Sequence, residues 1–67
     1  MKVVYMQVIY KEVEGAGRYY YGLYEADKAN NIADELNSDG YAGIYYCVCD
    51  AEDAKDLGVQ NLPLSLR

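Results

Sequence analysis

The chain has 67 residues, with 11 acidic and 6 basic side chains, a net charge of −5, two cysteines and no histidine. A domain of this length buries only about 60% of the surface that its unfolded chain exposes, so its core alone gives marginal stability. No stretch approaches the roughly 20 apolar residues that span a membrane, and nucleophile–base pairs are scarce without histidine. We therefore expect residues 1–67 to form one cytoplasmic domain without catalytic residues.

The first third of the chain predicts two strands. Residues 2–12 alternate with a period of two and are rich in β-branched and aromatic side chains, so they indicate a strand. Both of its faces are largely apolar, which favours a central position in a sheet. Gly15 and Gly17 supply the positive φ angles of a hairpin loop, and residues 18–24 form the returning strand.

A helix is predicted next, from the spacing of its apolar residues. Ala29, Ile32, Ala33 and Leu36 follow the i, i+3, i+4, i+7 pattern of an amphipathic helix, which we place at about residues 26–37. Residues 37–40, with the sequence Asn-Ser-Asp-Gly, end it with turn chemistry.

The last part of the chain predicts a third strand, a short helix and a C-terminal segment. Residues 41–49 form the strand, and Asp50 is the expected N-cap of a helix over residues 51–57, with Asp53 at the capping-box position. Gly58 ends this helix. Residues 59–67 contain three leucines and are too apolar for a disordered tail, so we expect them to pack on the domain or on a partner.

The predicted fold class is α+β, with the order β-β-α-β-(α). A hairpin followed by a right-handed crossover favours a three-stranded antiparallel or mixed sheet in the order 2-1-3, with one main helix on one face. We assign one set of residues to the helix-covered core face: Val4, Met6, Val8, Tyr19, Tyr21, Leu23, Ile44, Tyr46 and Val48. The opposite face then carries Tyr5, Ile9, Tyr20, Tyr24, Tyr41, Tyr45, Cys47 and Cys49.

Cys47 and Cys49 would lie side by side on the third strand. Their Cα atoms would be roughly 6.5 Å apart, near the upper limit for a disulfide, with side chains that run in parallel. Two thiols are half of a closed structural zinc site. We interpret both residues as ordinary small apolar side chains and predict no metal and no cofactor. The weaker alternatives are a redox role and a metal shared between two chains, as part of an enzyme of unrecognised type.

The negative charge is concentrated in the second half of the chain. Residues 25–56 hold nine acids against two lysines, a net charge of −7, which favours basic protein surfaces and disfavours direct binding of nucleic acid. Carboxylates on successive helix turns can imitate the phosphates of a nucleic acid. The acidic residues predicted to contact a partner are Asp27, Asp34, Glu35, Asp39, Glu52, Asp53 and Asp56.

Tyrosine is the distinctive residue of this chain, since it occurs nine times while Phe and Trp are absent. Tyrosine offers a large contact area and a hydrogen-bonding tip, and it is enriched at interfaces. Strand propensity and half-burial in a thin domain can explain the same composition. The residues predicted to form a self-interface or a partner interface are Tyr5, Tyr20, Tyr24, Tyr41 and Tyr45.

In length, acidity, element order and lack of catalytic residues, the chain resembles short proteins encoded by bacteriophages and mobile elements, including anti-defence and anti-CRISPR inhibitors of host enzymes. That resemblance implies an inhibitor of a host nucleic-acid-handling or defence enzyme. The charge of residues 25–56 favours a DNA-mimic-like protein that uses its acidic helical surface. The alternative is a homo-oligomeric structural or accessory module, such as a homodimer, with a tyrosine-rich self-interface. Neither hypothesis involves a membrane.

Overall fold

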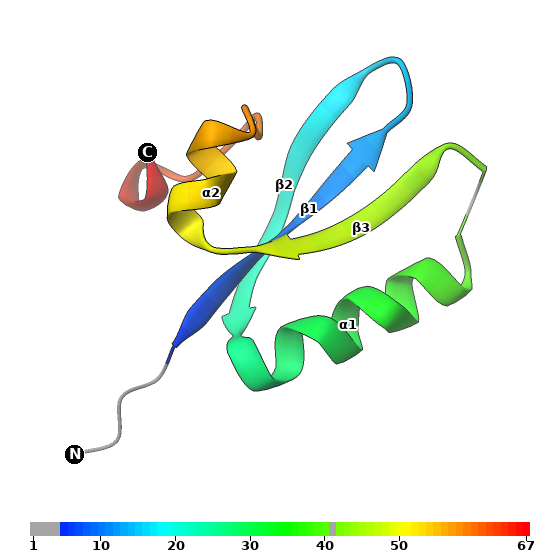
Figure 1. Cartoon of the computed structure of the whole chain (residues 1–67), viewed down its shortest axis with the longest axis horizontal. Coiled ribbons are helices and arrows are strands. Elements are labelled where there is room, and N and C mark those ends of the chain that lie inside the picture. Colours follow the sequence, from blue (N-terminus) through cyan, green and yellow to red (C-terminus); the bar gives the residue numbers. More distant parts are fainter. Residues whose placement is uncertain (1–4, 41) are drawn as a thin grey trace.

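The computed structural model describes residues 5–40 and 42–67. Strands β1 (Met6–Val13) and β2 (Gly17–Glu25) precede helix α1 (Ala26–Ser38), and strand β3 (Ile44–Cys49) leads into the short helix α2 (Ala51–Asp56) and a 3-10 turn, η1 (Leu64–Leu66). The strand order is β2-β1-β3, and β1 is antiparallel to both neighbours (Figure 1). This confirms the predicted α+β fold and the order 2-1-3, with an antiparallel sheet.

The hairpin between β1 and β2 forms where the glycines predict it. Val13 pairs with Gly17, and the Ala16 N–H donates a hydrogen bond of 3.0 Å to the Val13 carbonyl. Gly15 has a φ of 80° and Gly17 a φ of 108°, values that side chains other than glycine rarely adopt. The tight return aligns β2 along β1 and thereby fixes the register of the first two strands.

A β-bulge in β2 changes which tyrosines share a face. Ile9 pairs with Gly22 whereas Tyr10 pairs with Tyr20, so Tyr21 is left without a partner on β1. An extra residue of this kind interrupts the strict alternation of side chains along a strand. The Tyr21 ring meets the Tyr46 ring edge to face at 5.3 Å between centroids. The two tyrosines therefore lie on the same side of the sheet.

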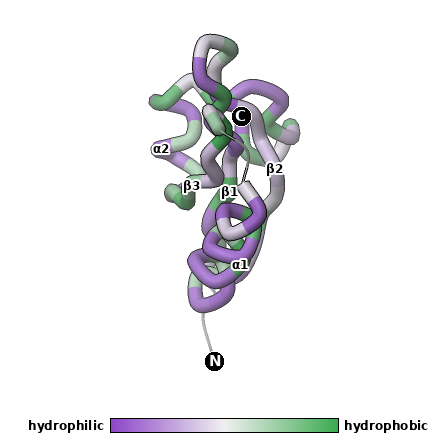
Figure 2. The backbone as a smooth tube through the Cα atoms, turned by 90° about the vertical axis from the view of Figure 1, so that its right-hand side faces the viewer, coloured by the Kyte–Doolittle hydropathy of each residue, from purple (hydrophilic) through white to green (hydrophobic). Residues whose placement is uncertain are grey.

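Helix α1 covers one face of the sheet, as predicted. Its buried residues, Ala29 and Ala33, pack on Ile9 of β1, and Ile32 and Leu36 complete the predicted apolar stripe. In Figure 2, most of α1 is coloured as hydrophilic, which agrees with one narrow apolar stripe on a solvated helix. We call this group of residues, together with Tyr24, Tyr46 and Val48, the α1 cluster.

The opposite face of the sheet is covered by α2 and the C-terminal segment. Val8 and Tyr10 of β1 are buried there against Ala54, Val59 and Leu62. The residues packed around them are Tyr20, Cys47, Cys49, Ala51 and Leu66. We call this group the α2 cluster. Since consecutive residues of β1 enter different clusters, β1 is buried from both sides.

The predicted division of residues between the two faces is wrong for Val8, Ile9 and Tyr24, which lie on the faces opposite to those predicted. It is right for Tyr46 and Val48 on the α1 side and for Tyr20, Cys47 and Cys49 on the other side. It placed Val8 with Val48, but Val8 pairs with Cys49 and Ile9 pairs with Val48, so Val8 and Val48 lie on opposite faces. Even positions of β1 therefore share a face with odd positions of β3. Val4 and Tyr41, which the prediction also placed, lie outside the described residues.

The C-terminal segment also closes the outer edge of β2. Tyr20 N–H donates to the Gln60 carbonyl and Gln60 N–H donates to the Arg18 carbonyl, each at 2.8 Å. Gln60 thus forms a short parallel bridge with β2 at Tyr19. Pairing of the backbone in this way satisfies groups that an edge strand otherwise leaves free.

Helix α2 starts and ends close to its predicted bounds, with the predicted residue at the N-cap, but the expected side-chain cap is not formed. Asp50 is the N-cap residue, yet its side chain makes no hydrogen bond to the helix backbone. The Gln7 amide donates to the Asp50 carboxylate instead, at 3.3 Å from Nε2 to Oδ1. Gly58, with a φ of 72°, lies just after the helix as predicted.

Two leucines of the C-terminal segment provide a test of its packing. Leu62 is 7% exposed in the α2 cluster, whereas Leu64 is 83% exposed. Leu62→Ala should lower the free energy of unfolding by about 2–4 kcal/mol because it removes buried methyl groups. Leu64→Ala should lower it by less than about 0.5 kcal/mol. Urea denaturation followed by circular dichroism measures both, and equal effects would show that the segment does not pack as described.

Candidate functional site

The predicted acidic residues are all exposed, but they do not form one surface. Asp27, Asp34 and Glu35 lie on α1, and Asp39 is the residue that ends it. The other three, Glu52, Asp53 and Asp56, lie on α2. Since α1 and α2 cover opposite faces of the sheet, the structure divides the acidic set into two separate groups.

The predicted interface tyrosines are also distributed over different surfaces. Tyr20 belongs to the α2 cluster and Tyr24 to the α1 cluster, and both are half-buried. Tyr5 and Tyr45 are 55% and 57% exposed. Tyr41 lies outside the described residues. The bulge in β2, which the sequence did not reveal, places Tyr20 and Tyr24 on different faces.

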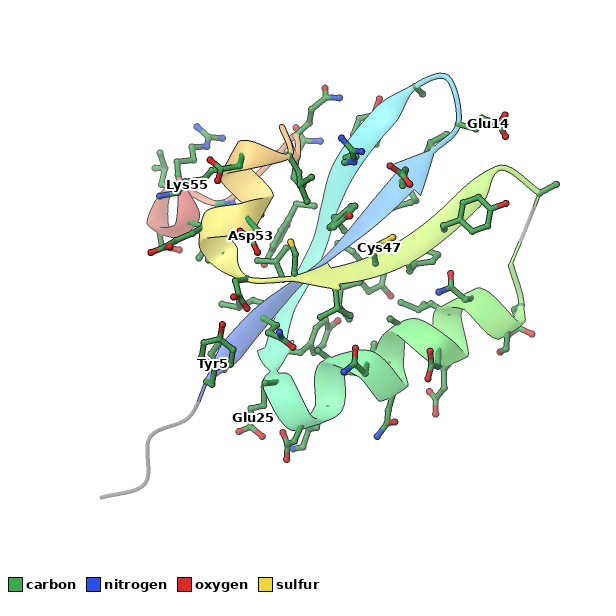
Figure 3. All side chains as sticks on the ribbon, viewed as in Figure 1. Tyr5, Glu14, Glu25, Cys47, Asp53 and Lys55 are labelled. Carbon is green, nitrogen blue, oxygen red and sulfur yellow. The ribbon has the colours of Figure 1, made fainter. Side chains whose placement is uncertain are left out.

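One tyrosine and the acids of α2 do come together. A pocket of about 300 Å³ is lined by Tyr5, Met6, Asp50, Ala51 and Glu52. The pKa of Tyr5 is raised, first by a hydrogen bond with Asp50 and also by the negative charges of Asp50, Asp53 and Glu52. Figure 3 shows Tyr5 at the start of β1, with Asp53 on the nearby α2. We call Tyr5, Met6, Asp50, Glu52 and Asp53 the Tyr5–α2 site.

Asp50 organises this site, and the sequence assigned it a different role. Hydrogen bonds from the Tyr5 hydroxyl and the Gln7 amide lower the pKa of Asp50, since both stabilise its ionised form. Its position directly after β3 places it beside β1, because Cys49 pairs with Val8. The contact of Asp50 with Tyr5 and Gln7 depends on the register between β1 and β3, which no local sequence motif predicts.

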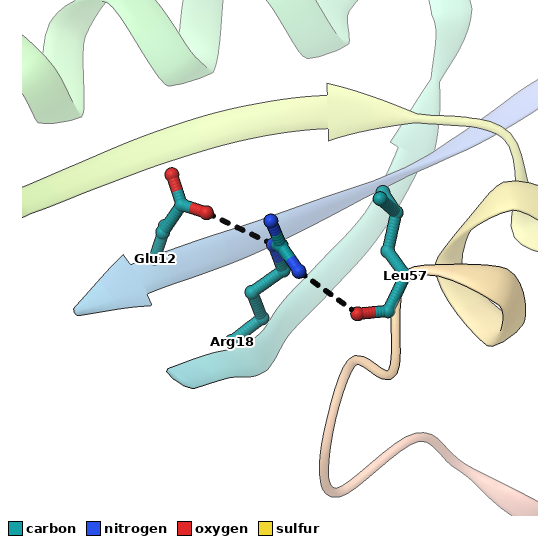
Figure 4. A network of polar contacts seen from close by, with 3 residues as sticks. All are labelled: Glu12, Arg18 and Leu57. Carbon is teal, nitrogen blue, oxygen red and sulfur yellow. Dashed lines mark hydrogen bonds and ion pairs between the residues drawn. The ribbon is translucent and has the colours of Figure 1, made fainter. Parts of the chain in front are cut away.

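A second pocket lies beside the hairpin, with a volume of about 400 Å³. Its charged residues are Glu12, Glu14 and Arg18, and the exposed Tyr45 also lines it. The Arg18 Nε donates to Glu12 at 2.9 Å, and the Arg18 Nη1 donates to the Leu57 carbonyl at 3.1 Å (Figure 4). Arg18 therefore connects β2 to the end of α2, and its charge compensates that of Glu12.

The two cysteines lie on the same face of β3 as half-buried members of the α2 cluster. Both are free thiols. Burial raises the pKa of Cys49, and the carboxylates of Asp53 and Asp50 raise it further. The pKa of Tyr10 is raised to about 12, first by burial and second by the nearby Cys47 thiol. The raised pKa values keep the Cys49 thiol and the Tyr10 hydroxyl protonated and uncharged near neutral pH.

Within residues 5–40 and 42–67, no three His, Cys, Asp or Glu side chains are grouped so that they could hold a metal ion. The helices in the same described part of the chain are too short or too polar to cross a membrane. No protein-family model, curated protein or solved structure is significantly similar to the chain. The site is therefore described from its own geometry.

The raised pKa of Cys49 predicts slow alkylation at neutral pH. In the Cys47→Ser variant, the rate of reaction with iodoacetamide should rise with pH around a midpoint above the ordinary thiol value of 9.0. Asp53→Asn should move that midpoint downwards because it removes a negative charge. Mass spectrometry of alkylated protein measures the rate, and urea-unfolded protein serves as the control. A midpoint at or below the unfolded value would contradict the burial of this thiol.

The lowered pKa of Asp50 predicts a specific pH dependence. Its contribution to stability should be complete above the unfolded pKa and decline as the pH falls through the lower folded value. Tyr5→Phe removes the largest cause of the shift and should raise the Asp50 pKa towards 3.8. Carbon-13 NMR of the carboxyl group measures the pKa, with Tyr45→Phe as the matched control. An unchanged Asp50 in Tyr5→Phe would show that the two side chains do not interact.

Proposed function

We propose that the chain is a small binding protein that recognises a cationic surface of another protein through the Tyr5–α2 site. The observation that supports this proposal is the meeting of the exposed Tyr5 ring with two carboxylates, Asp50 and Glu52, around one pocket. The negative charge of Asp53 is also close enough to raise the pKa of Tyr5. The contribution of the chain is recognition, and the proposal assigns it no catalytic step.

An arginine or lysine side chain fits the chemistry of this site. The face of a tyrosine ring attracts a cation, and carboxylates accept charge-assisted hydrogen bonds from a guanidinium or an ammonium group. Met6 is 39% exposed and offers an adaptable apolar contact for the aliphatic part of such a side chain. The lowered pKa of Asp50 favours its ionised form, so this carboxylate is available to a cation near neutral pH.

The partner class that we propose is a nucleic-acid-handling enzyme or a defence enzyme of the host cell. The proposed effect of binding is inhibition of that enzyme. Such enzymes have basic grooves, and the carboxylates of the Tyr5–α2 site, Asp50, Glu52 and Asp53, complement them. A bacteriophage or mobile-element origin and action in the host cytoplasm belong to the same proposal. A common tyrosine self-interface receives less support, because Tyr20 and Tyr24 enter different clusters.

A cationic probe tests the location of the site without knowledge of the partner. When nona-arginine is titrated into the labelled protein at low salt, the largest NMR shift changes should occur at Tyr5, Met6 and residues 50–53. The response should weaken strongly as salt is added, because exposed charges are screened. Nona-glutamate is the control peptide. Shift changes confined to α1 would place cation binding on the other face of the sheet and contradict the proposed site.

The division of the acids between two faces makes a sharp test with the partner itself. Protein without an affinity tag can be immobilised to capture ligands from a bacterial lysate, which mass spectrometry then identifies. Glu52→Lys combined with Asp53→Lys should weaken binding of the purified partner at least about tenfold. The matched double variant on α1, Asp34→Lys with Glu35→Lys, should have a smaller effect. The reverse order of effects would overturn the Tyr5–α2 assignment, and a partner that still binds nucleic acid normally would refute inhibition.

A further inference from the structure

Strand β3 has the composition of a segment that pairs readily with other strands. Its six residues, Ile44–Cys49, contain no charge, no proline and no glycine, and they are β-branched, aromatic or thiol side chains. It is also an outer strand of the sheet, since β1 pairs with only one of its sides. An uncharged outer strand of high β-propensity is a template for pairing with another chain.

The side chain of Asn37 occupies the free side of this strand. The Tyr46 N–H donates to Asn37 Oδ1 at 2.8 Å, and Asn37 Nδ2 donates to the Tyr46 carbonyl at 2.9 Å. One primary amide thus makes both of the hydrogen bonds that a residue of a neighbouring strand would make with Tyr46. Alternate residues of a strand direct their backbone groups to the same side, so Ile44 and Val48 face this edge as well.

The outer edge of β2 is closed in a comparable way by a different part of the chain. There, the backbone of Gln60 accepts from Tyr20 and donates to Arg18. Both outer strands of the sheet are therefore engaged by the chain itself, one by the backbone of the C-terminal segment and one by a side chain of α1. A side-chain amide covers one residue of β3, so within residues 5–40 and 42–67 this closure depends on Asn37.

We propose that Asn37 guards the β3 edge against self-association and that its removal lets β3 pair with β3 of a second copy. The second copy is the occupant because the exposed segment is the same in each molecule and two antiparallel β3 strands would meet symmetrically across a two-fold axis. The two sheets would then join into one across this edge. This inference does not depend on the Tyr5–α2 site or on the identity of a partner.

Asparagine suits this position because its amide carries a donor and an acceptor at one end. An aspartate would retain the acceptor for the Tyr46 N–H but would set a negative charge against the Tyr46 carbonyl. An alanine would leave both backbone groups of Tyr46 to water or to another strand. Asn37 itself is exposed at the end of α1, outside both clusters, so its replacement removes little packing.

Asn37→Ala provides the test, studied by sedimentation velocity under reducing conditions across a wide range of concentration. The unmodified protein should sediment as a monomer, and the variant should self-associate at least about tenfold more tightly, which corresponds to exposure of two backbone groups. Asn31→Ala, an exposed asparagine on the outward side of the same helix, should behave as the unmodified protein.

Two further variants separate edge pairing from a general loss of stability. Ala33→Gly weakens α1 and the α1 cluster while it keeps Asn37, and it should remain monomeric. Tyr45→Lys places a charge on β3 at a side chain that is 57% exposed, and in combination with Asn37→Ala it should restore the monomer.

Hydrogen exchange identifies the strand that pairs. In the associated Asn37→Ala variant, the amides of Ile44 and Val48 should become more protected than in the monomer. The proposal is overturned if Asn37→Ala stays monomeric, if Ala33→Gly associates equally, or if the unmodified protein already associates through β3. It is also overturned if the added protection appears at another surface.

Discussion

The rest of the structure depends on the burial of β1 from both sides and along both edges. Val8 and Ile9 are adjacent residues that are completely buried, in different clusters, so two separate elements must cover the sheet. The described part of the chain has one long helix, α1, and that helix covers only one face. The C-terminal segment and α2 must therefore supply the second core. This requirement explains why residues 59–67 carry apolar side chains after the last regular helix, where a solvated tail would be polar.

The local elements could be read from the sequence because each depends on residues close together in the chain. The stripe from Ala29 to Leu36 defines a helix face, and Gly15 and Gly17 define a tight return. The face of each strand could not be read in the same way. Both faces of β1 and β3 carry apolar side chains, so no polar alternation marks inside and outside. The register of β3 and the bulge at Tyr21 decide which side chains lie on each face of the sheet. Both features arise from contacts between residues that are distant in the sequence.

The candidate site was predicted only in part for the same reason. Glu52, Asp53 and Tyr5 were each recognised, but as members of two different surfaces. Their association depends on the position of Asp50 beside β1, where hydrogen bonds from Tyr5 and Gln7 compete with the helix cap that the local sequence predicts. A carboxylate can satisfy the backbone of its own helix or side chains of another strand, and tertiary structure makes that choice. The result is an ionised group at the centre of a mixed aromatic and acidic surface.

The closed edges of the sheet also restrict how a partner can be recognised. Strand addition draws its affinity from backbone groups, and here Gln60 and Asn37 already bond with the outer strands at Arg18, Tyr20 and Tyr46. A partner that paired with β3 would have to displace the Asn37 amide and leave it to water. Contacts through side chains carry no such cost, since the carboxylates of Glu52 and Asp53 and the ring of Tyr5 already point outwards from folded elements. The backbone arrangement therefore favours recognition through charge and aromatic contact, which is the chemistry that the Tyr5–α2 site offers.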